Sequence, residues 1–201
     1  MKRVFLHIGC GPKKKRDTTP GFNIPEWTEL RLDIDPRVHP DLVGTMTDMP
    51  VVKDKSVDAI YSSHNVEHLY PHEVPLAFSE FKRVLRQTGF VVITCPDLQS
   101  LGSLIADDKL TEPVYQSPAG PRAPIDILFG HRPHLSSGNL FMAHHCGFTE
   151  RVLRESLKAS GFSGVTSKRR GHPYYDLWAL ATVQRMGPAE LSRLAGIHFP
   201  D

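Results

Sequence analysis

The sequence predicts an α/β protein built on a mostly parallel sheet that helices cover on both faces. Short apolar runs typical of strands alternate along the chain with amphipathic segments typical of helices, as at residues 4–8 and 73–86. The first run stops at Gly9, and Gly11 follows two positions later. Glycine lacks a Cβ, so the backbone there can turn sharply and a ligand can approach main-chain N–H groups. We therefore expect a small-ligand site at the end of the first strand.

Length and composition favour one domain and a small partner. The 201 residues are 40% hydrophobic, which is enough for a sizeable core, and no shift in composition divides the chain. We expect a single domain over residues 1–201. The 24 basic residues against 22 acidic residues leave a net charge of +2, which argues against nucleic acid as the partner. The oligomeric state does not follow from the sequence.

Cysteine usage and hydropathy bear on the compartment. Cys10, Cys95 and Cys146 are an odd number without framework spacing, which favours free thiols in a reducing compartment. The first apolar run is shorter than a signal-peptide core, and no run of about 18 apolar residues is present to span a membrane. We expect a cytoplasmic protein with no membrane partner.

Six segments beyond the first run are expected to be strands. The final two are joined without a crossover helix and must therefore pair antiparallel. The six lie at residues 29–35, 41–45, 57–61, 90–96, 164–168 and 177–183.

Helices are expected between these strands, with one exception. Residues 73–86 carry apolar side chains at helical spacing, and Gly89 permits a left-handed stop. Thr149 is a suitable N-cap for a second amphipathic helix. Residues 13–21, directly after the glycine loop, carry no apolar stripe and end in Pro-Gly, so the first helix is expected to be shortened or missing. The tail from Pro188 is expected to form a short helix at best.

Six motifs in one order resemble those of class I S-adenosylmethionine-dependent methyltransferases. They are LHIGCG at 6–11, LDIDP at 32–36, TDMP at 47–50, SVDAIYSS at 56–63, EHL at 67–69 and RVLRQTG at 83–89. The resemblance implies a three-layer Rossmann-like fold whose seven-stranded sheet is mostly parallel with one antiparallel strand. It also implies S-adenosyl-L-methionine as cofactor and methyl transfer as the activity.

The resemblance assigns the cofactor to residues at the tips of the predicted strands. Asp33 is expected to bind the ribose hydroxyls, with Asp35 as the alternative, and Asp48 with Met49 is expected at the adenine. His7 replaces a carboxylate that the family often has, and Lys13 replaces a third glycine. The expected cofactor-binding residues are His7, Gly9, Cys10, Gly11, Asp33, Ile34, Asp48, Met49 and Ser63.

A polar cluster follows the strand predicted at 57–61, where open parallel sheets place their ligands. His64 or His68 is a candidate general base, because an unperturbed imidazole titrates near neutrality. The alternative is that Glu67 and His68 only orient the loop by hydrogen bonding. Methyl transfer to a nucleophilic atom needs alignment and exclusion of water rather than a base. The expected catalytic residues are His64 and His68.

Residues 97–147 form an irregular, proline-rich insert that we expect to act as a lid or acceptor pocket. The insert carries His131, His134, His144, His145 and Cys146. No pair has zinc-finger spacing and no H-E-x-x-H helix is present, so we expect no metal. We expect these side chains, with Tyr174 and Tyr175, to shape the acceptor pocket; for His144 a structural hydrogen bond is the alternative.

Two function classes follow from these patterns. The first is an S-adenosylmethionine-dependent methyltransferase acting on an unidentified small molecule. The second is a non-catalytic nucleotide-binding or regulatory protein on the same fold, because His7, Lys13 and the reduced first helix depart from the family pattern. An NAD(P)-dependent oxidoreductase is disfavoured, because the G-x-G-x-x-G fingerprint opening a helix is missing.

Overall fold

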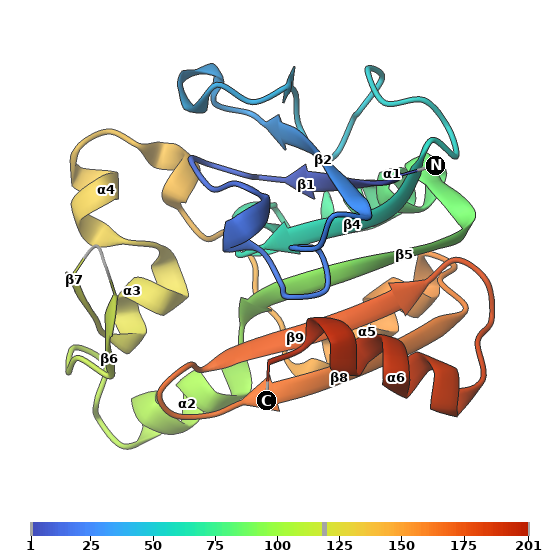
Figure 1. The fold of residues 1–201 in the computed structure, drawn as a ribbon. Helices are drawn as coiled ribbons and strands as arrows, with labels where there is room; N and C mark the ends of the chain where they lie inside the picture. The colour runs from blue at the N-terminus through green and yellow to red at the C-terminus, as the bar shows by residue number, and fades with distance from the viewer. Residues whose placement is uncertain (1, 118–119, 201) are drawn as a thin grey trace.

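The computed structural model describes residues 2–117 and 120–200, and its centre is a seven-stranded sheet (Figure 1). The strand order is β3-β2-β1-β4-β5-β9-β8. The first five strands are parallel, and β9 runs antiparallel to both β5 and β8. The strands are β1 (Arg3–Ile8), β2 (Trp27–Asp33), β3 (Leu42–Val43), β4 (Val57–Ser63), β5 (Leu85–Pro96), β8 (Gly164–Arg170) and β9 (Asp176–Thr182). The predicted mostly parallel sheet with one reversed strand is confirmed.

Helices cover both faces of the sheet, and the insert gathers beyond the carboxyl ends of the parallel strands (Figure 1). The insert contains α2 (Leu98–Ala106), the hairpin β6 (Tyr115–Ser117) and β7 (Gly120–Arg122), α3 (Pro124–Phe129), α4 (Arg132–Ser136) and η4 (Leu140–Met142). The remaining helices are α1 (Val74–Val84), α5 (Glu150–Ala159), α6 (Pro188–His198) and the short η1 (Lys15–Asp17), η2 (Pro36–Val38) and η3 (Val66–His68). None of the helices in the described residues is long and apolar enough to cross a membrane.

Successive side chains of the central strands point to opposite faces of the sheet, so the protein has two hydrophobic cores, one on each face. Leu6 faces the core that α1 and α5 cover, whereas its neighbour Phe5 faces the core that contains Phe22, Trp27 and residues of α6. Both side chains are fully buried. A strand buried on both faces is read in the sequence as a continuous apolar run, which is why β1 was predictable.

The predicted loss of the first helix is confirmed. The C-terminal helix α6 covers part of the sheet face that the missing helix would cover. After the glycine loop only η1 is helical, and Phe22 packs on Phe5 with ring centroids 4.4 Å apart. His198 of α6 lies against Phe22 at 4.3 Å, and its Nδ1 lies 2.8 Å from the buried Thr19 hydroxyl. A Cβ on Gly21 would lie 2.6 Å from His198, so glycine allows α6 this close approach. The tail is therefore an eleven-residue helix that completes a core, not the short helix expected.

The expected helix stop at Gly89 is wrong. Helix α1 already ends at Val84, and Leu85 takes up extended backbone that begins β5. Gly89 lies inside this strand, where a Cβ would lie 2.9 Å from the Arg86 carbonyl oxygen and 3.2 Å from that of Asp58. Glycine is needed here for close approach of backbone, not for a left-handed cap. The expected N-cap is confirmed, because the Thr149 side chain accepts a hydrogen bond from the Val152 N–H.

Burial of His198 makes stability depend on pH. Burial lowers the pKa of His198 to about 4, below its ordinary value of 6.5. Between these values the unfolded chain binds more protons than the folded one, so the free energy of unfolding should fall as the pH falls through this window, by up to roughly 3 kcal/mol. Urea denaturation of wild type and His198→Gln at pH 7 and pH 4.5 measures this contribution. The variant should lose less stability on acidification, and an equal loss in both proteins would refute the assignment.

Candidate functional site

One cleft of about 530 Å³ opens where the parallel strands end. Its volume is in the range of small-molecule sites, roughly 300–1,000 Å³. The tips of β1, β2 and β4 and the segments after β2 and β3 form one part of the wall. The insert, together with the segment after β4, forms the other part. The lining residues are 7–13, 32–35, 38, 44–46, 63–65, 68–70, 73, 139–142 and 145.

The loop after β1 has a backbone conformation that requires glycine. Gly9 and Gly11 have φ angles of +59° and +52°, in the left-handed region. The space that a Cβ would take at Gly9 is occupied by the amide of Asn65. The Asn65 Nδ2 donates to the Ile8 carbonyl at 2.8 Å and to the Ser63 carbonyl at 3.1 Å. Asn65 therefore joins the tips of β1 and β4 beneath the cleft.

Asp33 and Arg31, both from β2, hold the same loop from the other side. The Asp33 carboxylate accepts hydrogen bonds from the Gly11 N–H at 2.7 Å and from the Asp35 N–H at 2.9 Å. The buried Arg31 guanidinium donates to the carbonyls of Gly11 and Lys13. The sequence did not single out Arg31 or Asn65, although a cation inside the apolar alternation of β2 was a signal.

His7, on β1 before the glycine loop, and Cys10, within the loop, are neutral groups at pH 7. The His7 Nδ1 donates to Glu29 Oε1 at 2.7 Å, and Glu29 Oε2 accepts from the Lys15 N–H at 2.9 Å. Burial lowers the pKa of His7 and outweighs the opposing effect of Glu29. Burial also raises the pKa of the Cys10 thiol to about 11, so Cys10 is not a thiolate at neutral pH.

Asp48 and Met49 do not lie where the resemblance implies. Asp48 is exposed, Met49 is fully buried in the core, and neither lines the cleft. The Met49 N–H donates to Glu80 Oε2 at 2.7 Å, which fixes this turn against α1. Thr45 and Met46 line the cleft instead.

The other expected cofactor residues at the strand tips line the cleft. Ile34 is half exposed there, and the Ser63 hydroxyl lies 2.8 Å from the Thr94 hydroxyl. Asp35 also lines the cleft, but its carboxylate accepts hydrogen bonds from the Arg37 N–H and side chain at 2.8–2.9 Å. Asp35 is thus occupied by a neighbour, whereas Asp33 binds only backbone N–H groups.

The segment after β4 carries two histidines, His64 and His68, next to the buried Glu67. His64 and His68 both line the cleft, whereas Glu67 is buried beneath it. The His64 Nδ1 lies 3.4 Å from Glu67 Oε1. Burial by itself would raise the pKa of Glu67, but His64, His68 and His144 together outweigh it, and the pKa lies below its usual range. Glu67 is therefore a carboxylate at neutral pH.

The end of the insert returns to this cluster. The His68 Nδ1 donates to the Ala143 carbonyl at 2.9 Å, and the rings of His68 and His144 lie 4.8 Å apart. The ring of His145 stacks on Tyr70 at 4.2 Å at the rim of the cleft. His144 itself does not line the cleft, and neither do Tyr174 and Tyr175. The guanidinium of Arg170 lies over the Tyr174 ring at 3.9 Å, away from the cleft.

Comparison with known proteins finds a methyltransferase domain in part of the chain. Residues 6–93 match the family model described as a methyltransferase domain. This range holds the second half of β1, all of β2, β3, β4 and α1, and most of β5. The chain therefore carries a methyltransferase domain, in keeping with the resemblance of its motifs to class I S-adenosylmethionine-dependent methyltransferases. This methyltransferase uses S-adenosylmethionine as its cofactor. The sequence matches none of the curated proteins with which it was compared.

Solved methyltransferases share the fold at low sequence identity. A Methanosarcina mazei S-adenosylmethionine-dependent methyltransferase superposes with a TM-score of 0.58 at 15% identity, over 92% of this chain and 94% of that one. A possible histamine N-methyltransferase from Thermotoga maritima gives 0.57 at 15%, over 92% and 83%. The Burkholderia thailandensis 1,6-didemethyltoxoflavin-N1-methyltransferase, solved with S-adenosylhomocysteine, gives 0.55 at 15%, over 90% and 70%. At these identities the likeness shows the fold alone.

Removing Arg31 should destabilise the methyltransferase. Arg31→Met removes a buried guanidinium and leaves the Gly11 and Lys13 carbonyls without their donor, so the free energy of unfolding should fall by roughly 2–4 kcal/mol. The matched control is Arg37→Met, because Arg37 is exposed and bonds only its neighbour Asp35; it should change stability by about 0.5 kcal/mol or less. Denaturant unfolding compares the two, and equal losses would contradict a supporting role for Arg31.

Proposed function

We propose that this methyltransferase methylates an oxygen or nitrogen of a small molecule that binds in the same cleft as the cofactor. The observation that carries this proposal is the composition of the cleft wall. One part is the glycine loop and the tip of β2, and the other part is the insert together with the segment after β4. A single cleft lined in this way suits a donor and an acceptor that must meet in line.

We assign the cofactor to the wall formed by β1 and β2. Asp33 would accept hydrogen bonds from the ribose hydroxyls, because each of its oxygens bonds one backbone N–H and can accept another donor. The apolar side chains of Ile34 and Met46 would pack on the adenine, in place of Met49. His7, Gly9, Cys10, Gly11 and Ser63 would shape the floor under the methionine portion.

We assign the acceptor to the wall formed by the insert. Leu140, Phe141 and Tyr70 line the cleft while remaining more than half exposed. Apolar and aromatic side chains of this kind favour an acceptor with a planar or apolar body. His64 is the candidate proton acceptor, because Glu67 faces its Nδ1 and orients the ring. His68 is less available, because Ala143 fixes its ring.

The compartment and the remaining partners follow from composition. Cys10, Cys95 and Cys146 form no disulfide. We propose that the enzyme works in the cytoplasm, because unpaired thiols persist in a reducing compartment. With a near-neutral net charge of +2, nucleic acid is not proposed as the acceptor.

The two aspartates at the tip of β2 test the cofactor assignment. Asp33→Ala should weaken binding of S-adenosylhomocysteine by roughly tenfold to a hundredfold, because it removes charge-assisted hydrogen bonds. Asp35→Ala should leave the affinity within a few-fold, because Arg37 already occupies that carboxylate. Calorimetric titration of both variants, with melting temperatures to confirm folding, compares them. The reverse order of affinities would move the ribose to Asp35.

The acceptor class is tested by turnover. Purified enzyme with S-adenosylmethionine should form S-adenosylhomocysteine when supplied with members of a panel of small phenols, amines and heterocycles. Asp33→Ala at the same concentrations is the matched control and should reduce the rate in proportion to its weaker cofactor binding. Turnover that is found only with protein or nucleic acid acceptors would contradict the proposal.

A further inference from the structure

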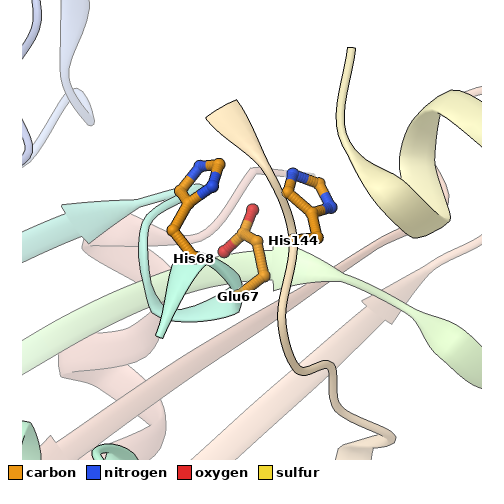
Figure 2. A group of neighbouring side chains, drawn as sticks. All are labelled: Glu67, His68 and His144. Atoms are coloured by element: carbon orange, nitrogen blue, oxygen red, sulfur yellow. The ribbon is translucent and has the colours of Figure 1, made fainter. Parts of the chain in front are cut away.

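Glu67, His68 and His144 form a compact cluster from two distant parts of the chain. Glu67 and His68 belong to η3, directly after β4, whereas His144 follows η4 near the end of the insert. One potential ligand atom from each of the three lies within 4.8 Å of the others. Figure 2 shows the carboxylate of Glu67 between the two imidazole rings.

Backbone contacts fix this approach. The N–H groups of His145 and Cys146 donate to the Glu67 carbonyl at 2.9 and 3.2 Å. The His68 ring donates to the carbonyl of Ala143, the residue before His144. The two segments are therefore tied together at the level of the cluster, and the three side chains meet because of backbone pairing.

The Glu67 carboxylate lacks the hydrogen bonds that such burial normally requires. Its side chain is 1% exposed, and neither oxygen has a hydrogen-bond donor at bonding geometry among the described residues. The Nδ1 of His64, at 3.4 Å, is a long contact. A buried carboxylate without hydrogen bonds is costly unless a cation compensates it. The environment thus favours a positive group beside Glu67, either a protonated histidine or a cation that the neutral rings bind.

The two imidazoles present the lone pairs that such a cation needs. A backbone carbonyl can only accept, so the Nδ1 of His68 carries a proton for Ala143, and the Nδ1 of His144 carries one for Ile127 at 2.8 Å. In the neutral rings Nε2 is then the lone-pair nitrogen. Metal-bound histidines characteristically donate their other N–H to a carbonyl or carboxylate in this way.

We propose that Glu67, His68 and His144 bind a divalent transition-metal cation. Two imidazole nitrogens and one carboxylate oxygen are a common ligand set for Zn²⁺ and Fe²⁺ at sites that keep an open coordination position. Ligand atoms of a tetrahedral site with bonds of about 2.1 Å lie about 3.4 Å apart, so the side chains must draw together slightly. His64 then acts as the outer partner of the ligating carboxylate.

The proposed cation site lies next to the cleft. His68 lines the cleft, so a cation held by its ring stands beside the wall assigned to the acceptor. An acceptor oxygen or nitrogen could then occupy the open position and be oriented by the metal. This last step rests on the proposed function, whereas the metal site itself does not. The sequence predicted no metal, because spacing along the chain does not reveal that His144 meets His68.

The test is calorimetric titration of chelator-treated protein with ZnCl₂, without S-adenosylmethionine. Wild type should bind one equivalent with a dissociation constant that is roughly micromolar or tighter. Glu67→Gln and His144→Ala should each weaken binding by on the order of tenfold to a hundredfold or more. The matched control is His134→Ala, an exposed histidine of the same insert, which should bind as wild type does.

Thermal melting with and without ZnCl₂ supplies a second readout. The metal should raise the melting temperature of wild type and His134→Ala, and should raise that of the two ligand variants much less. Melting of the metal-free variants shows that they are folded. Absence of saturable binding to wild type, or equal affinity in Glu67→Gln and wild type, overturns the proposal. Failure to find methyl transfer does not affect either result.

Discussion

The hydrogen bonds from the Gly11 and Asp35 N–H groups to the Asp33 carboxylate are the constraint on which the cleft depends. The bond from Gly11 joins the tips of β1 and β2, the bond from Asp35 fixes the end of β2, and Asn65 joins the tips of β1 and β4. A left-handed loop costs little only at glycine, and it keeps one conformation because side chains from neighbouring strands bind its backbone. The shape of the cofactor wall therefore follows from polar contacts at strand ends, and the apolar sheet beneath supplies their positions.

Much of the fold could be predicted from the sequence because its strands are buried on both faces. Runs such as that of β1 carry a strong local signal, and two closely spaced final strands can only pair antiparallel. The role of α6 could not be predicted, because its contribution is the fit of His198 between Thr19 and Phe22, which are far away in the chain. Gly89 was misread for a related reason: one of the groups that it approaches closely is the Asp58 carbonyl on β4, which is distant in the chain.

The lining of the cleft was predictable at the tips of strands and not where it depends on contacts between distant segments. The resemblance led to Asp33 and Ser63, and both line the cleft. It also led to Asp48 and Met49, but a turn anchored by Glu80 carries Met49 into the core and leaves Met46 facing the cleft. The meeting of Glu67 and His68 with His144 is a property of the folded insert, and no local pattern encodes it.

The most direct test of the central claim is a crystal structure of the enzyme with S-adenosylhomocysteine. The account predicts ribose hydroxyls on the Asp33 carboxylate, the adenine between Ile34 and Met46, and the thioether directed toward the wall that His68 and the insert form. A cofactor bound outside this cleft, or a ribose held by Asp35 with Asp33 bonded only to its own loop, would contradict it.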